Sequence, residues 1–146
     1  MAPLVNQNHL RLGAFNCQGA MRSVAYISTL LESNKIDILC LSEHWLFPDS
    51  LCFLNSVSTE FCSCGVSDEN LDVLDPYRRG KGGVAIMWRK VLNQNVTLLP
   101  IDSDRIIGIS VELERKQFIT ILAVYLPSTN ADIASYIVFV FTPGSV

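Results

Sequence analysis

The chain has 146 residues, the length of one domain, and 49% of them are hydrophobic while 17% are charged. This composition argues against a disordered protein, and the apolar runs are far shorter than the ~18 residues of a membrane-spanning helix. The net charge of −3 does not by itself indicate a nucleic-acid-binding protein. No secretory signal is visible and the five cysteines form no C-x-x-C pair, so we expect an intracellular protein, cytoplasmic or nuclear, with reduced thiols.

The first forty residues show a strand, a helix and a second strand. Residues 10–15 form a short apolar run that ends at Asn16, and a turn containing Gly19 follows. Apolar side chains recur at helical spacing in residues 21–32, and residues 36–41 (IDILCL) are typical of a buried strand. This order predicts an α/β layered fold in which the helix covers one face of a sheet.

Glu43 and His44 come directly after the second strand. Turns normally use Asn, Asp or Gly, so Glu43 either belongs to a site at the carboxyl end of the strand or is an exposed carboxylate. On a continuing strand His44 would point to the opposite face. We therefore expect His44 to be a surface or packing residue and not the catalytic partner of Glu43.

The rest of the chain has β patterning. One edge strand is expected near Phe61, and residues 72–83 (DVLDPYRRGKGG) form a surface loop. Four strand-like runs follow, at residues 83–88, 96–99, 106–113 and 118–125. A polar turn joins the last two runs, which predicts that they form an antiparallel hairpin. Residues 131–141 are almost wholly apolar, and we expect them to be a core element without partners.

Basic residues gather in the loop just before the strand-like run at residues 83–88. Arg78, Arg79 and Lys81 lie close together there, while the acidic residues are scattered along the chain. The loop is either an ordinary solvated loop or a contact for nucleic-acid phosphates.

Four segments, in this order, resemble the endonuclease/exonuclease/phosphatase family, and within it the apurinic-type endonuclease domain of non-LTR (LINE-like) retrotransposons. They are LGAFNCQGA with Asn16, IDILCLSEHWL with Glu43, RRGKGGVAIMWR, and DRIIGISVEL with ITILAVYLPS, which contains Tyr125. The resemblance divides the chain into a leader (1–9), a truncated endonuclease/exonuclease/phosphatase domain (10–130) and an aberrant apolar tail (131–146).

The resemblance implies the N-terminal half of a four-layer α/β/β/α sandwich of the DNase I type. We expect a mixed, mostly antiparallel sheet with a covering helix. If each half of such a domain supplies one sheet, a lone half leaves one face of its sheet bare.

The resemblance also assigns roles. Glu43 would bind Mg²⁺, and Asn16 would be a metal-site or catalytic neighbour that orients metal or water. The Tyr125 hydroxyl would lie near the scissile phosphate, unless Tyr125 is only a core aromatic. Mg²⁺ prefers oxygen ligands and keeps several waters, which suits so small a set of donors. By the same resemblance, Arg78, Arg79 and Lys81 would contact the phosphate backbone of DNA.

Two elements of the family pattern are absent from the 146 residues: Gly-Asp-x-Asn and the terminal Ser-Asp-His. Hydrolysis at neutral pH needs a positioned base or a metal-bound hydroxide. We therefore expect a fragment of a Mg²⁺-dependent DNA-nicking phosphodiesterase that is inactive alone and needs its missing C-terminal half as a partner. A non-catalytic α/β interaction module is the alternative, and another phosphatase-like member of the family is a third possibility.

Overall fold

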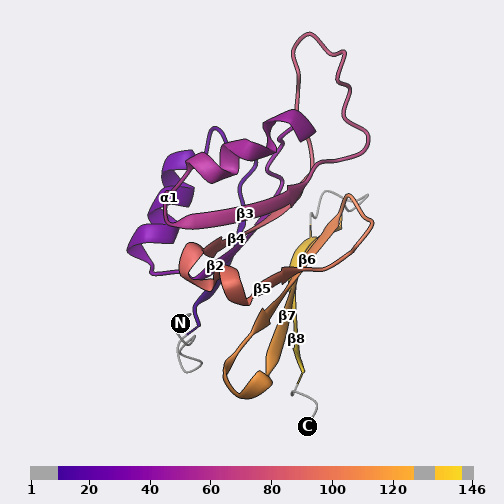
Figure 1. Ribbon diagram of the computed structural model, residues 1–146. Helices are drawn as coiled ribbons and strands as arrows, with labels where there is room; N and C mark the ends of the chain where they lie inside the picture. Colours follow the sequence, from indigo (N-terminus) through magenta and orange to yellow (C-terminus); the bar gives the residue numbers. More distant parts are fainter. Residues whose placement is uncertain (1–9, 127–133, 143–146) are drawn as a thin grey trace.

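The structure is a computed structural model that describes residues 10–126 and 134–142 (Figure 1). Its α-helix and strands are β1 (Leu12–Asn16), α1 (Val24–Ser33), β2 (Ile38–Ser42), β3 (Phe61–Val66), β4 (Val84–Arg89), β5 (Val96–Leu98), β6 (Ile106–Glu112), β7 (Phe118–Leu126) and β8 (Ala134–Thr142). Short 3-10 helices are η2 (Pro48–Ser56), η3 (Lys90–Asn95) and η4 (Glu114–Lys116). No helix within the described ranges is long and apolar enough to cross a membrane.

The first sheet, called sheet A, has the strand order β1-β2-β4-β3. β1 and β2 are parallel, because α1 returns the chain to the same end of the sheet. β4 is antiparallel to both β2 and β3, so β1, β2 and β3 all run in one direction. The strand near Phe61 lies at the edge of the sheet, as the sequence predicted.

The second sheet, sheet B, is antiparallel throughout, with the order β5-β6-β7-β8. The predicted hairpin is confirmed as β6 and β7, joined through η4. The expectation that the apolar segment after residue 130 lacks a partner is wrong for residues 134–142, because β8 pairs with β7 along its whole length. An apolar segment satisfies its backbone groups most readily by adding to an open sheet edge.

Two hydrophobic cores arrange these elements in layers. On one face of sheet A, Ile27 and Leu31 of α1 are fully buried against β2 and β4 residues such as Leu39 and Met87. The other face packs against sheet B, where Ile86 of β4 lies in the same buried cluster as Ile121 of β7. The described chain therefore builds α1, sheet A and sheet B as successive layers (Figure 1).

This layering corrects the expectation of one sheet with a bare face. The chain contributes strands to both sheets, and they cover one another. Ile107, Ile109 and Val111 alternate with Gly108 and Ser110 along β6, and the face that they form is turned toward sheet A. A period-two pattern reports burial but does not report which sheet a strand joins.

Candidate functional site

Polar side chains meet at the carboxyl end of sheet A. Asn16 ends β1 in register with Ser42, the last residue of β2, and Glu43 follows Ser42. Because β3 runs in the same direction, Asp68 just beyond it reaches the same edge. Carboxyl ends of neighbouring strands with one direction lie together, so the topology gathers groups from distant parts of the chain.

The backbone at Glu43 is held in a left-handed conformation. Its φ is +54°, and that of Trp45 is +58°. The β1–α1 loop fixes this turn, since the amide of Gly19 donates to the Glu43 carbonyl at 2.8 Å and that of Ala20 to the His44 carbonyl at 2.9 Å. Such conformations cost of order 1–3 kcal/mol and persist only where the surroundings enforce them. The chain therefore leaves the strand abruptly at Glu43.

The buried Cys17 thiol also holds the turn at Glu43. Its Sγ lies 3.3 Å from the Ser42 carbonyl oxygen and 3.4 Å from that of Glu43. Burial raises the pKa of the Cys17 thiol to about 12, so the thiol stays protonated and donates. Cys17 therefore supports the turn and is not a nucleophile.

The Glu43 side chain is buried, with 6% of its surface exposed, and it points toward sheet B. Its Oε1 accepts a hydrogen bond of 3.4 Å from the Tyr125 hydroxyl. Within the described residues, Glu43 Oε2 and Asn16 Oδ1 are buried and have no hydrogen-bond partner. Unpartnered buried acceptors are costly, so two of them at one strand edge mark a place for a cation or a donor.

Tyr125, near the end of β7, brings sheet B into this site. Burial and the neighbouring Glu43 carboxylate raise the pKa of the Tyr125 hydroxyl above its usual value. The charge of Asp68 acts in the same direction, and Arg105 acts against it. The hydroxyl is therefore protonated at neutral pH and can donate a hydrogen bond.

His44 is a packing residue with 1% of its surface exposed. Its Nδ1 accepts from the Leu46 amide at 2.9 Å, so Nε2 carries the proton and donates to the Val66 carbonyl at 2.9 Å. Gly83 packs directly on the imidazole ring, where no Cβ would fit. Burial lowers the pKa of His44, and the neutral ring joins the ends of β2, β3 and β4.

The basic loop lies in the arm, defined as residues 67–83 between β3 and β4, which extends beyond the sheets in Figure 1. The Arg78 guanidinium stacks 4.2 Å from the Phe47 ring centroid and forms an ion pair of 2.9 Å with Asp49, holding the pKa of Asp49 below its usual value. Arg79 lies 3.6 Å from Asp75, and Lys81 has no ion pair within the described chain. The structure therefore engages Arg78 and leaves Lys81 free.

The donor set fits a hard divalent cation only in part. Glu43 Oε2 and Asn16 Oδ1 are oxygen donors of the kind that Mg²⁺ prefers, and Mg²⁺ needs few protein ligands when water and substrate complete its shell. Among the described residues, no group of three or more His, Cys, Asp or Glu side chains could hold a metal ion. A cation here would thus depend on Glu43, Asn16 and non-protein oxygens.

A protein-family model, described as the Endonuclease/Exonuclease/phosphatase family, matches residues 13–141. The chain belongs to this family. The match begins within β1 and ends within β8. A search of curated proteins found no match.

Solved structures agree on the fold of this family member. The human Nocturnin catalytic domain with bound sulfate aligns with a TM-score of 0.60 at 15% identity, covering 84% of this chain and 51% of that one. A 3′ phosphatase, NExo, from Neisseria bound to product DNA hairpin aligns with a TM-score of 0.51 at 20% identity. That alignment covers 70% of this chain and 38% of that one. An AP endonuclease from Archaeoglobus fulgidus aligns with a TM-score of 0.50 at 20% identity, covering 73% of this chain and 38% of that one. The chain thus spans between about a third and a half of these structures' length.

These likenesses confirm a DNase I-like, mostly antiparallel α/β architecture for this chain. The structure brings three of the residues proposed from sequence to one end of the sandwich: Asn16, Glu43 and Tyr125. The sequence reasoning missed Asp68, although a carboxylate just after a strand was the signal that had singled out Glu43. It missed the His44 contacts because Leu46, Val66 and Gly83 become neighbours only in the fold.

Proposed function

We propose that this chain is part of a Mg²⁺-dependent, nuclease-type phosphodiesterase domain that acts on DNA. One observation carries the proposal: a buried glutamate and a partly buried asparagine each present a buried, unpartnered oxygen at the carboxyl edge of one sheet, within the described residues. Buried polar groups are normally paired, so two unpaired oxygens at one edge of the sheet favour a ligand there. Membership of the family supports phosphoester hydrolysis as the chemistry.

Glu43 and Asn16 are the residues that would hold the cation. When bound, Mg²⁺ supplies electrostatic stabilisation of charge that develops on phosphoryl oxygens. The Tyr125 hydroxyl, protonated because the pKa of that group is raised, donates either to Glu43 or to a phosphate oxygen. Tyr125 thereby positions the carboxylate before substrate arrives and contributes a donor afterwards.

The arm supports a nucleic-acid substrate. Arg79 and Lys81 are exposed basic residues on a segment that ends beside Glu43, since the Gly82 carbonyl accepts from the Trp45 amide at 3.0 Å. Phosphate contacts of this kind position a duplex and carry no sequence information. Arg78 would contribute less, because its guanidinium is already paired with Asp49.

The family pattern places further catalytic groups in Gly-Asp-x-Asn and Ser-Asp-His elements, which this sequence lacks. We therefore propose that the chain is the N-terminal half of a LINE-like retrotransposon endonuclease, inactive alone, and that a C-terminal half would complete it. An intracellular location, cytoplasmic or nuclear, belongs to the same proposal.

Metal binding tests this function without requiring activity. Mn²⁺ replaces Mg²⁺ at oxygen sites, and its free ion is counted by electron paramagnetic resonance. We expect the 146-residue chain to bind Mn²⁺ and Glu43→Gln to lose that binding. Glu112→Gln, which removes an exposed glutamate at another strand end, is the matched control and should bind as the wild type does.

Equal Mn²⁺ binding by the wild type and Glu43→Gln would contradict the metal site and favour a non-catalytic interaction module. Supercoiled plasmid with Mg²⁺ tests inactivity separately. Nicking by the wild-type chain that vanishes in Glu43→Ala would show that the chain is active without a second half.

A further inference from the structure

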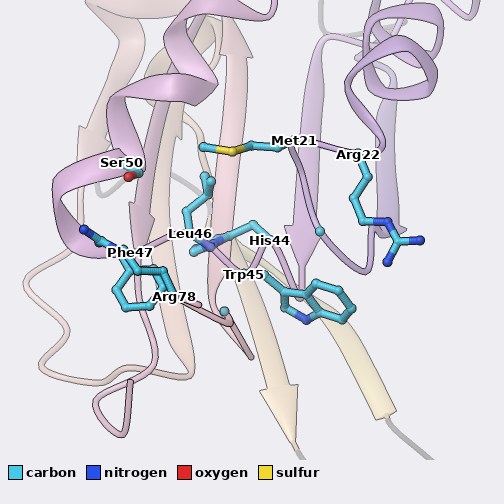
Figure 2. Close-up of a pocket in the computed structure, with 10 residues that line it drawn as sticks. Met21, Arg22, His44, Trp45, Leu46, Phe47, Ser50 and Arg78 are labelled. Carbon is cyan, nitrogen blue, oxygen red and sulfur yellow. The ribbon is translucent and has the colours of Figure 1, made fainter. Parts of the chain in front are cut away.

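A cavity of about 280 Å³ lies beside the candidate metal site, at the junction of the β1–α1 loop, the β2–η2 loop and the arm (Figure 2). Ten residues line it: Gly19, Met21, Arg22, His44, Trp45, Leu46, Phe47, Ser50, Arg78 and Gly80. It adjoins the Glu43 turn directly, because Gly19 donates its amide hydrogen to the Glu43 carbonyl. The proposed metal site does not use this cavity, and of the arm's basic residues only Arg78 lines it.

The lining combines flat aromatic surface with positive charge. Trp45 and Phe47 supply the rings, Met21 and Leu46 supply apolar surface, and Arg22 supplies an exposed cation. Among the described residues, no carboxylate lines the cavity. A ligand that suits it is planar at one end and anionic at the other.

Trp45 is held rigidly at the edge of this cavity. Its φ of +58° is unusual for a bulky side chain, and the conformation is fixed by the hydrogen bond from its amide to Gly82. Gly80 packs on the Trp45 carbonyl, where no Cβ would fit. A strained conformation imposed from two sides argues that the position of the indole matters.

Arg22 lies next to this indole. A Cβ at Gly19 would lie 2.9 Å from Arg22 Cγ and 3.0 Å from Trp45 Cε3, so the two side chains flank one glycine. Figure 2 shows them in the same part of the pocket, apart from the Phe47 and Arg78 pair. Within the described chain, Arg22 has no ion pair or hydrogen bond, whereas Arg78 is paired with Asp49. Arg22 is therefore the cation available to an anionic ligand.

We infer that this cavity binds a nucleotide, with the base stacked on Trp45 and the phosphate received by Arg22. Base stacking on an aromatic side chain is tolerant of sequence, and a guanidinium donates several hydrogen bonds to a phosphate. In a bound strand, this nucleotide would neighbour the phosphate presented to Glu43. The choice of a nucleotide rests on the proposed function, whereas the cavity and its chemistry do not.

The two tryptophans of the chain make the test specific. Trp88 is buried in β4 with 6% of its surface exposed, so Trp88→Phe leaves Trp45 as the only tryptophan to be excited selectively at the long-wavelength edge of its absorption. We expect 2′-deoxyadenosine 5′-monophosphate to quench the Trp45 fluorescence of this full-length variant saturably. Deoxyadenosine should bind more weakly, and inorganic phosphate at the same concentrations should leave the fluorescence unchanged.

Arg22→Gln distinguishes recognition of the phosphate from recognition of the base. We expect this substitution to weaken binding of the monophosphate about threefold to tenfold and to leave binding of deoxyadenosine unchanged. This loss lies between the effect of an exposed ion pair and that of a hydrogen bond to a charged group. Arg11→Gln, which removes an exposed arginine that precedes β1 and lies outside the cavity, is the matched control. If Trp88→Phe does not fold, equilibrium dialysis of the same nucleotide against wild type and Trp45→Leu gives the answer, with roughly tenfold weaker binding by Trp45→Leu.

The inference is overturned if neither fluorescence nor dialysis detects saturable binding, or if Arg22→Gln and Arg11→Gln weaken binding of the monophosphate equally. Failure of the proposed function looks different. In that case Mn²⁺ binding is absent while the monophosphate still quenches Trp45, and Glu43→Gln leaves the quenching unchanged.

Discussion

At the scale of single residues, the site consists of buried polar groups whose protonation states are set by their surroundings. Tyr125 is protonated and donates to Glu43, and His44 is neutral with both ring nitrogens engaged. Neither arrangement is visible from residue type, since tyrosine and histidine at strand ends are ordinary. Two consequences for stability can be measured.

Tyr125→Phe removes the hydroxyl that donates to Glu43 at 3.4 Å. Because this hydrogen bond is long, we expect a loss of about 1 kcal/mol in the free energy of unfolding, measured by urea titration. The raised pKa of Tyr125 means that the folded state holds its proton more tightly than the unfolded state. This contribution is complete below about pH 10 and is lost as the pH rises through the folded-state pKa, so the wild type should lose more stability there than Tyr125→Phe.

An identical loss of stability in the two proteins at alkaline pH would contradict this account. Tyr77→Phe is the control, because Tyr77 lies in the arm with 81% of its surface exposed. It should change neither the stability nor its dependence on pH.

For His44 we predict the opposite dependence of stability on pH, at acidic pH. Burial lowers the pKa of His44 below the ordinary value of 6.5, so below that pH the unfolded state binds a proton more readily than the folded state does. Its contribution is complete above pH 6.5 and is lost as the pH falls toward the folded-state pKa. We expect urea titrations to show a decline in stability between neutral pH and about pH 5 that is reduced in His44→Gln. An equal decline in both proteins would mean that other groups cause it.

At the scale of elements, the arm is the feature that links the sequence to the site. It leaves sheet A after β3 and returns to β4 through Gly82 and Gly83, whose φ values are +58° and +91°. The return passes His44 and Trp45 so closely that side chains are excluded at Gly80 and Gly83. The glycines therefore determine both the path of the arm and the position of the Glu43 turn.

Gly83→Ala tests this packing. The new Cβ would overlap the His44 ring at a backbone conformation that alanine rarely adopts, so we expect a loss of roughly 2–4 kcal/mol in the free energy of unfolding. Gly65→Ala in β3 is the matched control, since its Cβ would meet its nearest neighbour at 3.2 Å and needs only a small adjustment. Similar thermal melts for the two variants would show that the arm yields at Gly83.

The charges of the arm make a separate prediction about DNA. If Arg79 and Lys81 contact phosphates, neutralising either to Gln should reduce the slope of log affinity against log salt by about 0.9, measured by fluorescence anisotropy with duplex DNA. Arg78→Gln should change this slope less, because Arg78 is paired with Asp49. Lys35→Gln, beyond the opposite end of β2, is the control. Slopes unchanged in all four variants would remove the arm from the DNA interface.

At the scale of the whole molecule, one core joins the two sheets. Ile86 and Trp88 of sheet A lie in the same buried cluster as Ile109 and Ile121 of sheet B. Sheet B in turn supplies Tyr125 to a site whose carboxylate comes from sheet A. The site therefore depends on both sheets remaining packed.

Ile121→Ala tests this cooperation. Removing a fully buried side chain between the sheets should cost about 2–5 kcal/mol, and because the core is shared both sheets should unfold together. Tryptophan fluorescence, to which Trp88 of sheet A contributes, and far-ultraviolet circular dichroism should then give coincident urea transitions. Val91→Ala, at an exposed position, should change little. Transitions that separate for the two probes would show that the sheets are independent.

Much of this architecture was predictable because local patterns report burial. Strands β1, β2, β4, β6 and β7 and helix α1 lie where apolar spacing placed them, although α1 begins at Val24 and not at Met21. The residues before Val24 are used by the loop, since the Ser23 amide donates to the Gly19 carbonyl. The 3-10 helix η2 was not predicted, because its apolar positions have no regular helical period.

The sequence by itself showed that Asn16 and Glu43 follow apolar strands, and its resemblance to the family added Tyr125 as a candidate. Only the tertiary structure decided that the chain builds two sheets that cover each other, that Tyr125 donates to Glu43, and that Arg22 flanks Trp45 at a cavity. The reason is physical: periodicity and strand ends are encoded within a few neighbouring residues. Contacts such as Tyr125 with Glu43, by contrast, join positions 82 residues apart and follow from how the strands are ordered and packed.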